Sequence, residues 1–162
     1  MREHILLDFF VGRLDATALS RDLEGSIFLT GRDQAGIRIV DLESGDPIVT
    51  SHHLIKVCDA VERGLLEPWK VEAIGFCLVV SDHFHWDPST GDGARVEEVL
   101  GLWSAPHSRY PLTLGTVAKA RHLLLTGEYT FVAADREETP ARSWGARRVK
   151  VPERELHRAR EL

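Results

Sequence analysis

Apolar residues recur along most of this chain at the three- and four-residue spacing of amphipathic helices. The spacing predicts two short helices over residues 3–11 and 15–23, and Asp15 is placed to cap the second. It predicts four more helices over residues 51–64, 68–80, 96–103 and 113–125. Residues 71–80 carry the longest apolar run, so the helix that contains them is expected at the centre of the core.

The spacing changes at residues 27–50, where β-branched residues alternate with turn signals. Short strands are expected over residues 27–30, 37–42 and 47–50, and another over residues 129–132. Residues 135–148 are typical of a linker, and a frayed helix is expected over residues 152–162.

Together these patterns predict an α+β fold. We expect a mostly helical single globular domain over residues 1–134, with a small antiparallel β meander or hairpin near residues 27–50. Residues 135–162 are expected to form a polar, partly flexible C-terminal extension.

Length and composition agree with one globular domain, since the 162 residues are 43% hydrophobic and 28% charged. The start of the chain lacks the apolar stretch of a secretory signal, and no run approaches the roughly 20 apolar residues of a membrane span. Cys58 and Cys77 lie within apolar helical patterns, which favours reduced, packed thiols in a cytoplasmic protein.

Charge is unevenly distributed along the chain. Residues 1–134 contain 12 Lys/Arg against 19 Asp/Glu, whereas residues 135–162 contain 8 against 6. An acidic body disfavours nucleic acid as a ligand, because cationic side chains supply most of the affinity for phosphates. It favours a basic partner if the partner is charged, although a net charge of −5 also serves solubility alone.

The densest group of polar and aromatic residues is Ser81-Asp82-His83-Phe84-His85-Trp86-Asp87-Pro88, directly after the central apolar run. Trp86 stands between His85 and Asp87, a composition that is typical of interface hot spots. The position of this group predicts a surface that contacts a partner.

A metal site is the alternative interpretation of the same histidines. His83 and His85 would point the same way on an extended segment, and His52 or His53 would supply a third ligand. No His-Glu-x-x-His motif, cysteine pair, nucleophile elbow or phosphate loop accompanies them, so the pattern favours histidines that are exposed or at helix ends. We therefore assign no catalytic residue and expect no cofactor.

Several short motifs resemble those of small bacterial immunity-type proteins associated with polymorphic or contact-dependent toxins. They are Gly12-Arg13-Leu14, His53-Leu54, Cys58-Asp59-Ala60, Gly64-Leu65-Leu66 and residues 81–87, within a likeness over residues 1–130. The resemblance implies a cytosolic, mostly helical, non-catalytic protein that covers the basic active site of a toxin.

On this resemblance, an acidic and aromatic surface would meet the partner, with Trp86 as its anchor. The residues expected to bind are Asp82, His85, Trp86, Asp87, Asp92, Glu97 and Glu98. Two alternatives stay open, which are a small metal-dependent hydrolase that uses the His/Asp cluster and a structural or regulatory protein that forms homodimers through apolar helices.

Overall fold

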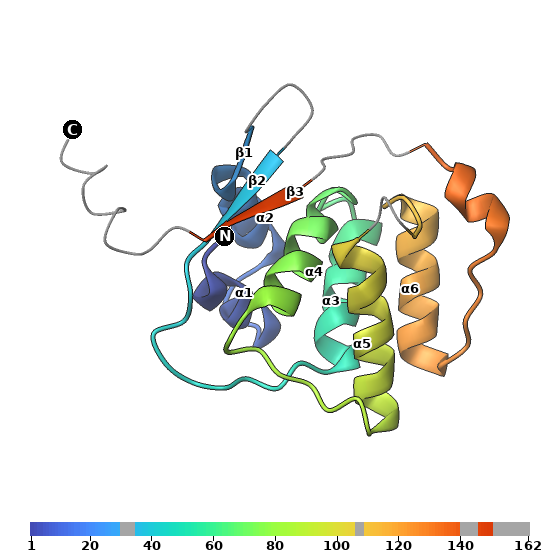
Figure 1. The fold of residues 1–162 in the computed structure, drawn as a ribbon, viewed down its shortest axis with the longest axis horizontal. Helices are drawn as coiled ribbons and strands as arrows, with labels where there is room; N and C mark the ends of the chain where they lie inside the picture. The colour runs from blue at the N-terminus through green and yellow to red at the C-terminus, as the bar shows by residue number, and fades with distance from the viewer. Residues whose placement is uncertain (30–34, 106–108, 140–145, 151–162) are drawn as a thin grey trace.

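A computed structural model describes residues 1–29, 35–105, 109–139 and 146–150 of the chain, which form a mostly helical α+β fold. The helices are α1 (Glu3–Phe10), α2 (Ala16–Ser26), α3 (Ser51–Glu62), α4 (Lys70–Val80), α5 (Gly91–Ser104) and α6 (Leu114–Thr126), and a 3-10 turn, η1 (Ala133–Glu137), follows α6. Helices α3 to α6 pack side by side, and α1, α2 and a small sheet lie to one side of them (Figure 1). All six predicted helices are confirmed.

Side-chain caps set where several of these helices begin. Asp15 caps α2, as expected, by accepting a hydrogen bond from the Ala18 backbone N–H at 2.8 Å. Thr90 caps α5 in the same way through the Gly93 N–H at 2.9 Å. Helix α5 therefore starts at Gly91, earlier than the predicted residue 96, because the threonine cap outweighs the turn-like composition of the glycines that follow it.

The sheet has three strands in the order β1-β2-β3. Strands β1 (Ile27–Leu29) and β2 (Ala35–Ile39) form the predicted antiparallel pair, and β3 (Ala146–Lys150) lies parallel to β2. The linker prediction for residues 135–148 is therefore wrong at residues 135–137, which belong to η1, and where β3 begins. The helix expected over residues 152–162 lies outside the described residues.

Two predicted strands are absent from the described part of the chain. Residues 47–50 join no sheet, and Ile48 instead forms an isolated bridge to His85. Residues 129–132 are irregular, and Tyr129 and Phe131 pack as an aromatic pair with ring centroids 5.2 Å apart. In each segment one side chain is buried without strand pairing in a sheet, Val49 in the first and Phe131 in the second, which their local pattern does not reveal.

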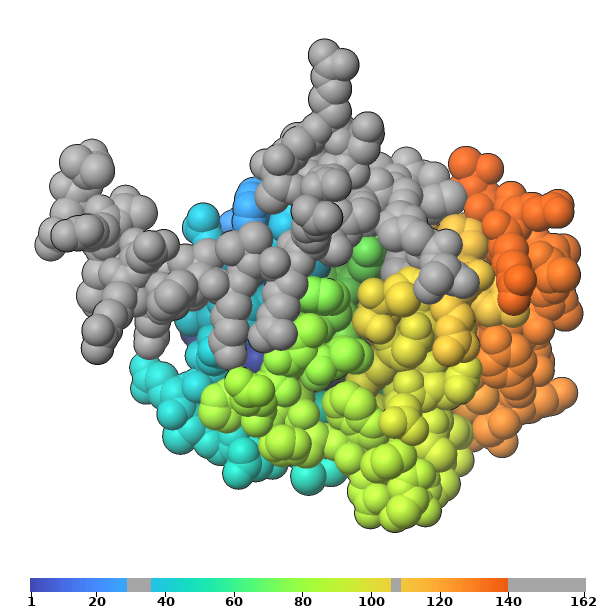
Figure 2. Space-filling model, in the orientation of Figure 1, coloured from blue at the N-terminus to red at the C-terminus, as the bar shows by residue number. Residues whose placement is uncertain are grey.

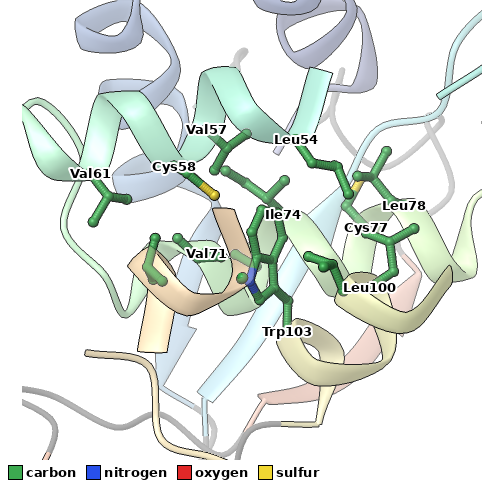
Figure 3. Packing of buried hydrophobic residues seen from close by; sticks show 14 of the residues in the cluster. Leu54, Val57, Cys58, Val61, Val71, Ile74, Cys77, Leu78, Leu100 and Trp103 are labelled. Carbon is green, nitrogen blue, oxygen red and sulfur yellow. The ribbon is translucent and has the colours of Figure 1, made fainter. Parts of the chain in front are cut away.

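The core is centred on Trp103, which is 1% exposed and lies among apolar side chains from α3, α4 and α5 (Figure 3). Helix α4 supplies Val71, Ile74, Cys77 and Leu78 to this cluster, so its predicted central place is confirmed. The crossing of α4 and α5 is close, because a Cβ atom at Gly75 would lie 2.6 Å from the Trp103 Cβ.

Charged contacts join the helices around this core. Lys70 on α4 is 1% exposed, and its Nζ donates to Ser20 Oγ and Glu24 Oε1, each at 2.7 Å. The Arg121 Nε on α6 donates to Asp59 Oδ1 on α3 at 2.7 Å. These pairs hold α2 against α4 and α6 against α3. They thereby fix α4, which the segment 81–90 follows, and α3, which the segment 41–50 precedes.

Neither cysteine is in a disulfide, since Cys58 and Cys77 are both buried free thiols, as predicted. Among the described residues, no helix combines the length and the apolar character that a bilayer crossing requires.

Candidate functional site

The polar segment after α4 lies against the loop that leads into α3. The backbone N–H of His85 donates to the carbonyl of Pro47 at 3.1 Å, and the N–H of Val49 donates to the carbonyl of His85 at 2.7 Å. The two loops run together along one edge of the molecule (Figure 1) and form adjoining surface in the space-filling view (Figure 2). We call residues 41–50 and 81–92 the two-loop surface.

Each loop is anchored by one apolar side chain in the core. Phe84 is 2% exposed and meets the ring of Phe10 edge-on, with ring centroids 6.2 Å apart, while Val49 anchors the other loop. The Ser81 Oγ accepts from the N–H groups of His83 and Phe84 at 3.0 and 3.2 Å. These bonds turn the chain sharply out of α4, so the segment is held and not a free tail.

The two histidines of the cluster face the neighbouring loop. His83 Nδ1 lies 3.0 Å from the Gly45 carbonyl oxygen, to which it donates, so the ring proton is on Nδ1. His85 Nε2 lies 3.6 Å from Asp46 Oδ1, and both side chains of that pair are exposed. The histidines thus add side-chain contacts to the backbone pairing.

His53 has a structural role at the start of α3. Its Nδ1 accepts from the Thr50 N–H at 3.2 Å in a capping box, and its ring stacks on Phe10 with centroids 4.9 Å apart. Burial lowers the pKa of His53, as do the neighbouring His52 and Lys56, and Asp92 opposes them. The ring is therefore neutral at pH 7, as an acceptor at Nδ1 must be.

The histidines of the alternative metal-site interpretation lie in separate local contacts. His53 Nδ1 is used by α3, His83 Nδ1 by Gly45, and His52 is exposed. In the part of the chain that the structure describes, no group of three or more His, Cys, Asp or Glu side chains is arranged to hold a metal ion.

Two of the predicted acidic residues also hold the local fold. Asp87 Oδ1 accepts from the Ser89 N–H at 2.9 Å and the Ser89 Oγ at 2.6 Å, and these bonds lower the pKa of this exposed carboxyl group. Asp92 Oδ2 accepts from the Ser51 N–H at 3.0 Å, and its Oδ1 accepts from Arg95 at 3.1 Å. Burial raises the pKa of Asp92, but these hydrogen bonds lower it by more. Both carboxylates thus stay ionised.

The other predicted residues differ in exposure. Asp82 and His85 are exposed on the two-loop surface, whereas Trp86 is half-buried and packs partly against the core. Glu97 and Glu98 lie farther along α5, and Glu98 Oε1 is 3.6 Å from an Arg109 guanidinium nitrogen.

The structure adds a loop that the sequence analysis did not include in the site. Asp41, Glu43 and Asp46 are exposed in the segment 41–50, which meets residues 81–92 through Pro47 and Val49, and Ile48 is 61% exposed. The two-loop surface therefore contains six carboxylates, and its sequence includes no Lys or Arg. The sequence alone shows that each segment lacks Lys and Arg. It does not show that the two segments pair, because they are far apart along the chain.

Two hollows lie elsewhere in the described residues. One, of about 570 Å³, lies where the end of α3 meets the start of α6 and is lined by apolar residues such as Leu66, Pro68 and Leu112. The other, of about 510 Å³, lies between α1, α2 and β2. Neither is lined by a residue of the two-loop surface.

A scan against protein-family models, a search of curated proteins and a search of solved structures gave no match to this chain.

Proposed function

We propose that this protein is a non-catalytic binding protein that uses the two-loop surface to cover a basic protein partner, as an immunity-type inhibitor covers a toxin domain. The observation that carries the proposal is that backbone hydrogen bonds join two loops. Together the two loops contain six carboxylates and no Lys or Arg. A patch in which one sign predominates steers a partner of the opposite sign and rejects one of the same sign.

Preorganisation supports this proposal. Both loops are anchored through Val49 and Phe84, so little conformational entropy would be lost when a partner binds. Ile48 and Trp86 provide apolar surface among the acids, and an apolar centre with a polar rim is the usual composition of a protein interface.

The same features define the partner class. The carboxylates would repel the phosphates of a nucleic acid, and they suit a protein surface rich in Lys and Arg. The proposal places the protein in the cytoplasm, where the two free thiols, Cys58 and Cys77, would stay reduced.

The test measures binding of basic toxin domains encoded in the same genome, each purified in inactive form and titrated by biolayer interferometry. We expect one domain to bind, and the double variant Asp46→Asn/Asp82→Asn to weaken its binding by at least about tenfold, or about 1.4 kcal/mol. The loss should shrink as salt is added, since exposed charges are screened. Asp87 and Asp92 are left intact because they hold the loop and two helices.

The matched control is Glu128→Gln/Glu137→Gln, which makes the same change in net charge at exposed positions outside the two-loop surface. It should bind as the unchanged protein does. Equal losses in both double variants would contradict a specific role of the two-loop surface, and a panel in which no basic domain binds would contradict the immunity-type function.

A further inference from the structure

A groove of about 510 Å³ between α1, α2 and β2 carries three arginines, in a chain whose net charge is −5. Arg2 comes from the start of α1, Arg21 from α2 and Arg38 from β2, and all three are exposed. These elements lie together beside the chain's N-terminus in Figure 1. The groove shares no residue with the two-loop surface.

Small residues on α2 open this groove. Ala18, Arg21, Asp22 and Gly25 follow the three- and four-residue spacing of one helix face. A Cβ atom at Gly25 would meet no atom within 4 Å, so the space above the helix at this point is open. The floor of the groove includes half-buried Ile5 and Leu14, which make it partly apolar.

Two of the three guanidinium groups are held in place. Arg2 Nε donates to Asp22 Oδ1 at 2.7 Å, and the Arg2 backbone N–H donates to Asp22 Oδ2 at 2.9 Å. This pairing uses Nε and not the terminal Nη1 and Nη2 groups, which carry further donors. The guanidinium carbon of Arg38 lies 5.9 Å from the centre of the Phe28 ring.

We propose that this groove binds a small, soluble phosphate monoester, with the phosphate at the three arginines and the organic group over Ile5 and Leu14. The side chains of the three arginines and Asp22 give the groove a formal charge of +2, which matches the charge of about −1.5 to −2 on a phosphate monoester at pH 7. Met1 also lines the groove, and burial lowers the pKa of its amino group to about 6, so this group is mostly neutral at pH 7.

The number of donors favours phosphate over carboxylate. Arginine binds oxyanions through paired N–H groups, and a phosphate has three terminal oxygens for three guanidinium groups. The volume falls within the roughly 300–1,000 Å³ of ordinary small-molecule sites, so an organic group fits beside the phosphate.

The test is a calorimetric titration of the full chain with hexyl phosphate as the probe. We expect saturable binding that weakens about tenfold in Arg21→Gln and in Arg38→Gln, the loss expected when a charge-assisted hydrogen bond is removed. Arg63→Gln removes an exposed arginine at the end of α3, outside the groove, and should bind hexyl phosphate normally. Thermal unfolding of each variant checks that the fold is intact.

Two further ligands test the phosphate-binding part and the apolar part of the proposed site one at a time. Inorganic phosphate should bind more weakly than hexyl phosphate, because it lacks the apolar group, and hexanol should not bind. The proposal is overturned if hexyl phosphate does not bind, or if Arg63→Gln weakens binding as much as Arg21→Gln. Binding to vesicles that contain phosphatidic acid, without binding to hexyl phosphate, would overturn the proposal that the ligand is a soluble ester.

Discussion

At the scale of single residues, Asp92 connects two helices through one carboxylate. It lies in the first turn of α5 and accepts a hydrogen bond from Ser51 at the first turn of α3. It thereby satisfies a backbone N–H that has no partner within α3, and it places a negative charge near two helix N-termini. A residue expected to meet a partner is thus also part of the scaffold.

We expect Asp92→Asn to lower the free energy of unfolding by about 1 kcal/mol at pH 7, as the loss of a charged cap does. The folded-state pKa lies below the ordinary value of 3.8, so the stabilisation is fully present above that pH and disappears as pH falls through the folded-state pKa. Urea unfolding of both proteins between pH 7 and pH 2 measures the difference.

The matched control is Glu97→Gln, an exposed acid on the same helix, whose replacement should leave the stability unchanged. An Asp92→Asn deficit that stayed constant down to pH 2 would contradict the role of the ionised carboxylate. The sequence predicts Asp92 at the surface, but its bond to Ser51 spans 41 residues, and no local pattern reports such a contact.

At the scale of elements, the start of α5 depends on a glycine without a side chain. A Cβ atom at Gly93 would lie 1.9 Å from the Asp87 carbonyl oxygen and 2.5 Å from its carbon, so the turn before the helix must close directly over this position. Since both neighbours are backbone atoms, no side-chain rotation relieves the clash.

Gly93→Ala should therefore destabilise the protein by about 1–3 kcal/mol, the usual cost of forcing extra volume into packed structure. Gly101→Ala lies on the same helix, where a Cβ atom meets nothing within 4 Å, and it should stabilise by about 0.5–1 kcal/mol through helix propensity. Urea unfolding followed by circular dichroism measures both. Equal effects of the two substitutions would show that helix propensity alone decides the outcome.

The elements themselves could be predicted to different extents. Helical periodicity and caps such as Asp15 are local, so the six helices were accessible from the sequence. The parallel pairing of β3 with β2 joins residues more than 100 positions apart, and a polar strand has little local pattern to mark it. Residues 47–50 have strand-like composition, but their pairing with His85 depends on where α4 ends.

At the scale of the whole molecule, the two thiols lie in the same hydrophobic core. Cys58 on α3 and Cys77 on α4 both line the cluster around Trp103 (Figure 3). Burial raises the pKa of both thiols, and the nearby carboxylates of Asp59 and Glu62 add to the effect at Cys58, as does Glu3 at Cys77. The reactive thiolate therefore forms only when the core opens.

We expect neither thiol to react with a disulfide reagent in the native protein, and both to become reactive together as urea unfolds it. Labelling rates measured on Cys58→Ala and Cys77→Ala across a urea series, beside circular dichroism, test this. Reaction of one cysteine well before the dichroism transition would mean that its helix opens separately from the rest.

The pairing of the two loops runs through backbone atoms, from His85 to Pro47 and from Val49 to His85. An exposed side chain such as Ile48 can therefore be replaced while the loops keep their shape. During evolution, such a surface would exchange one partner for another by substitution at its exposed positions alone. Homologues would then share the anchors Val49 and Phe84 and diverge at the residues between them.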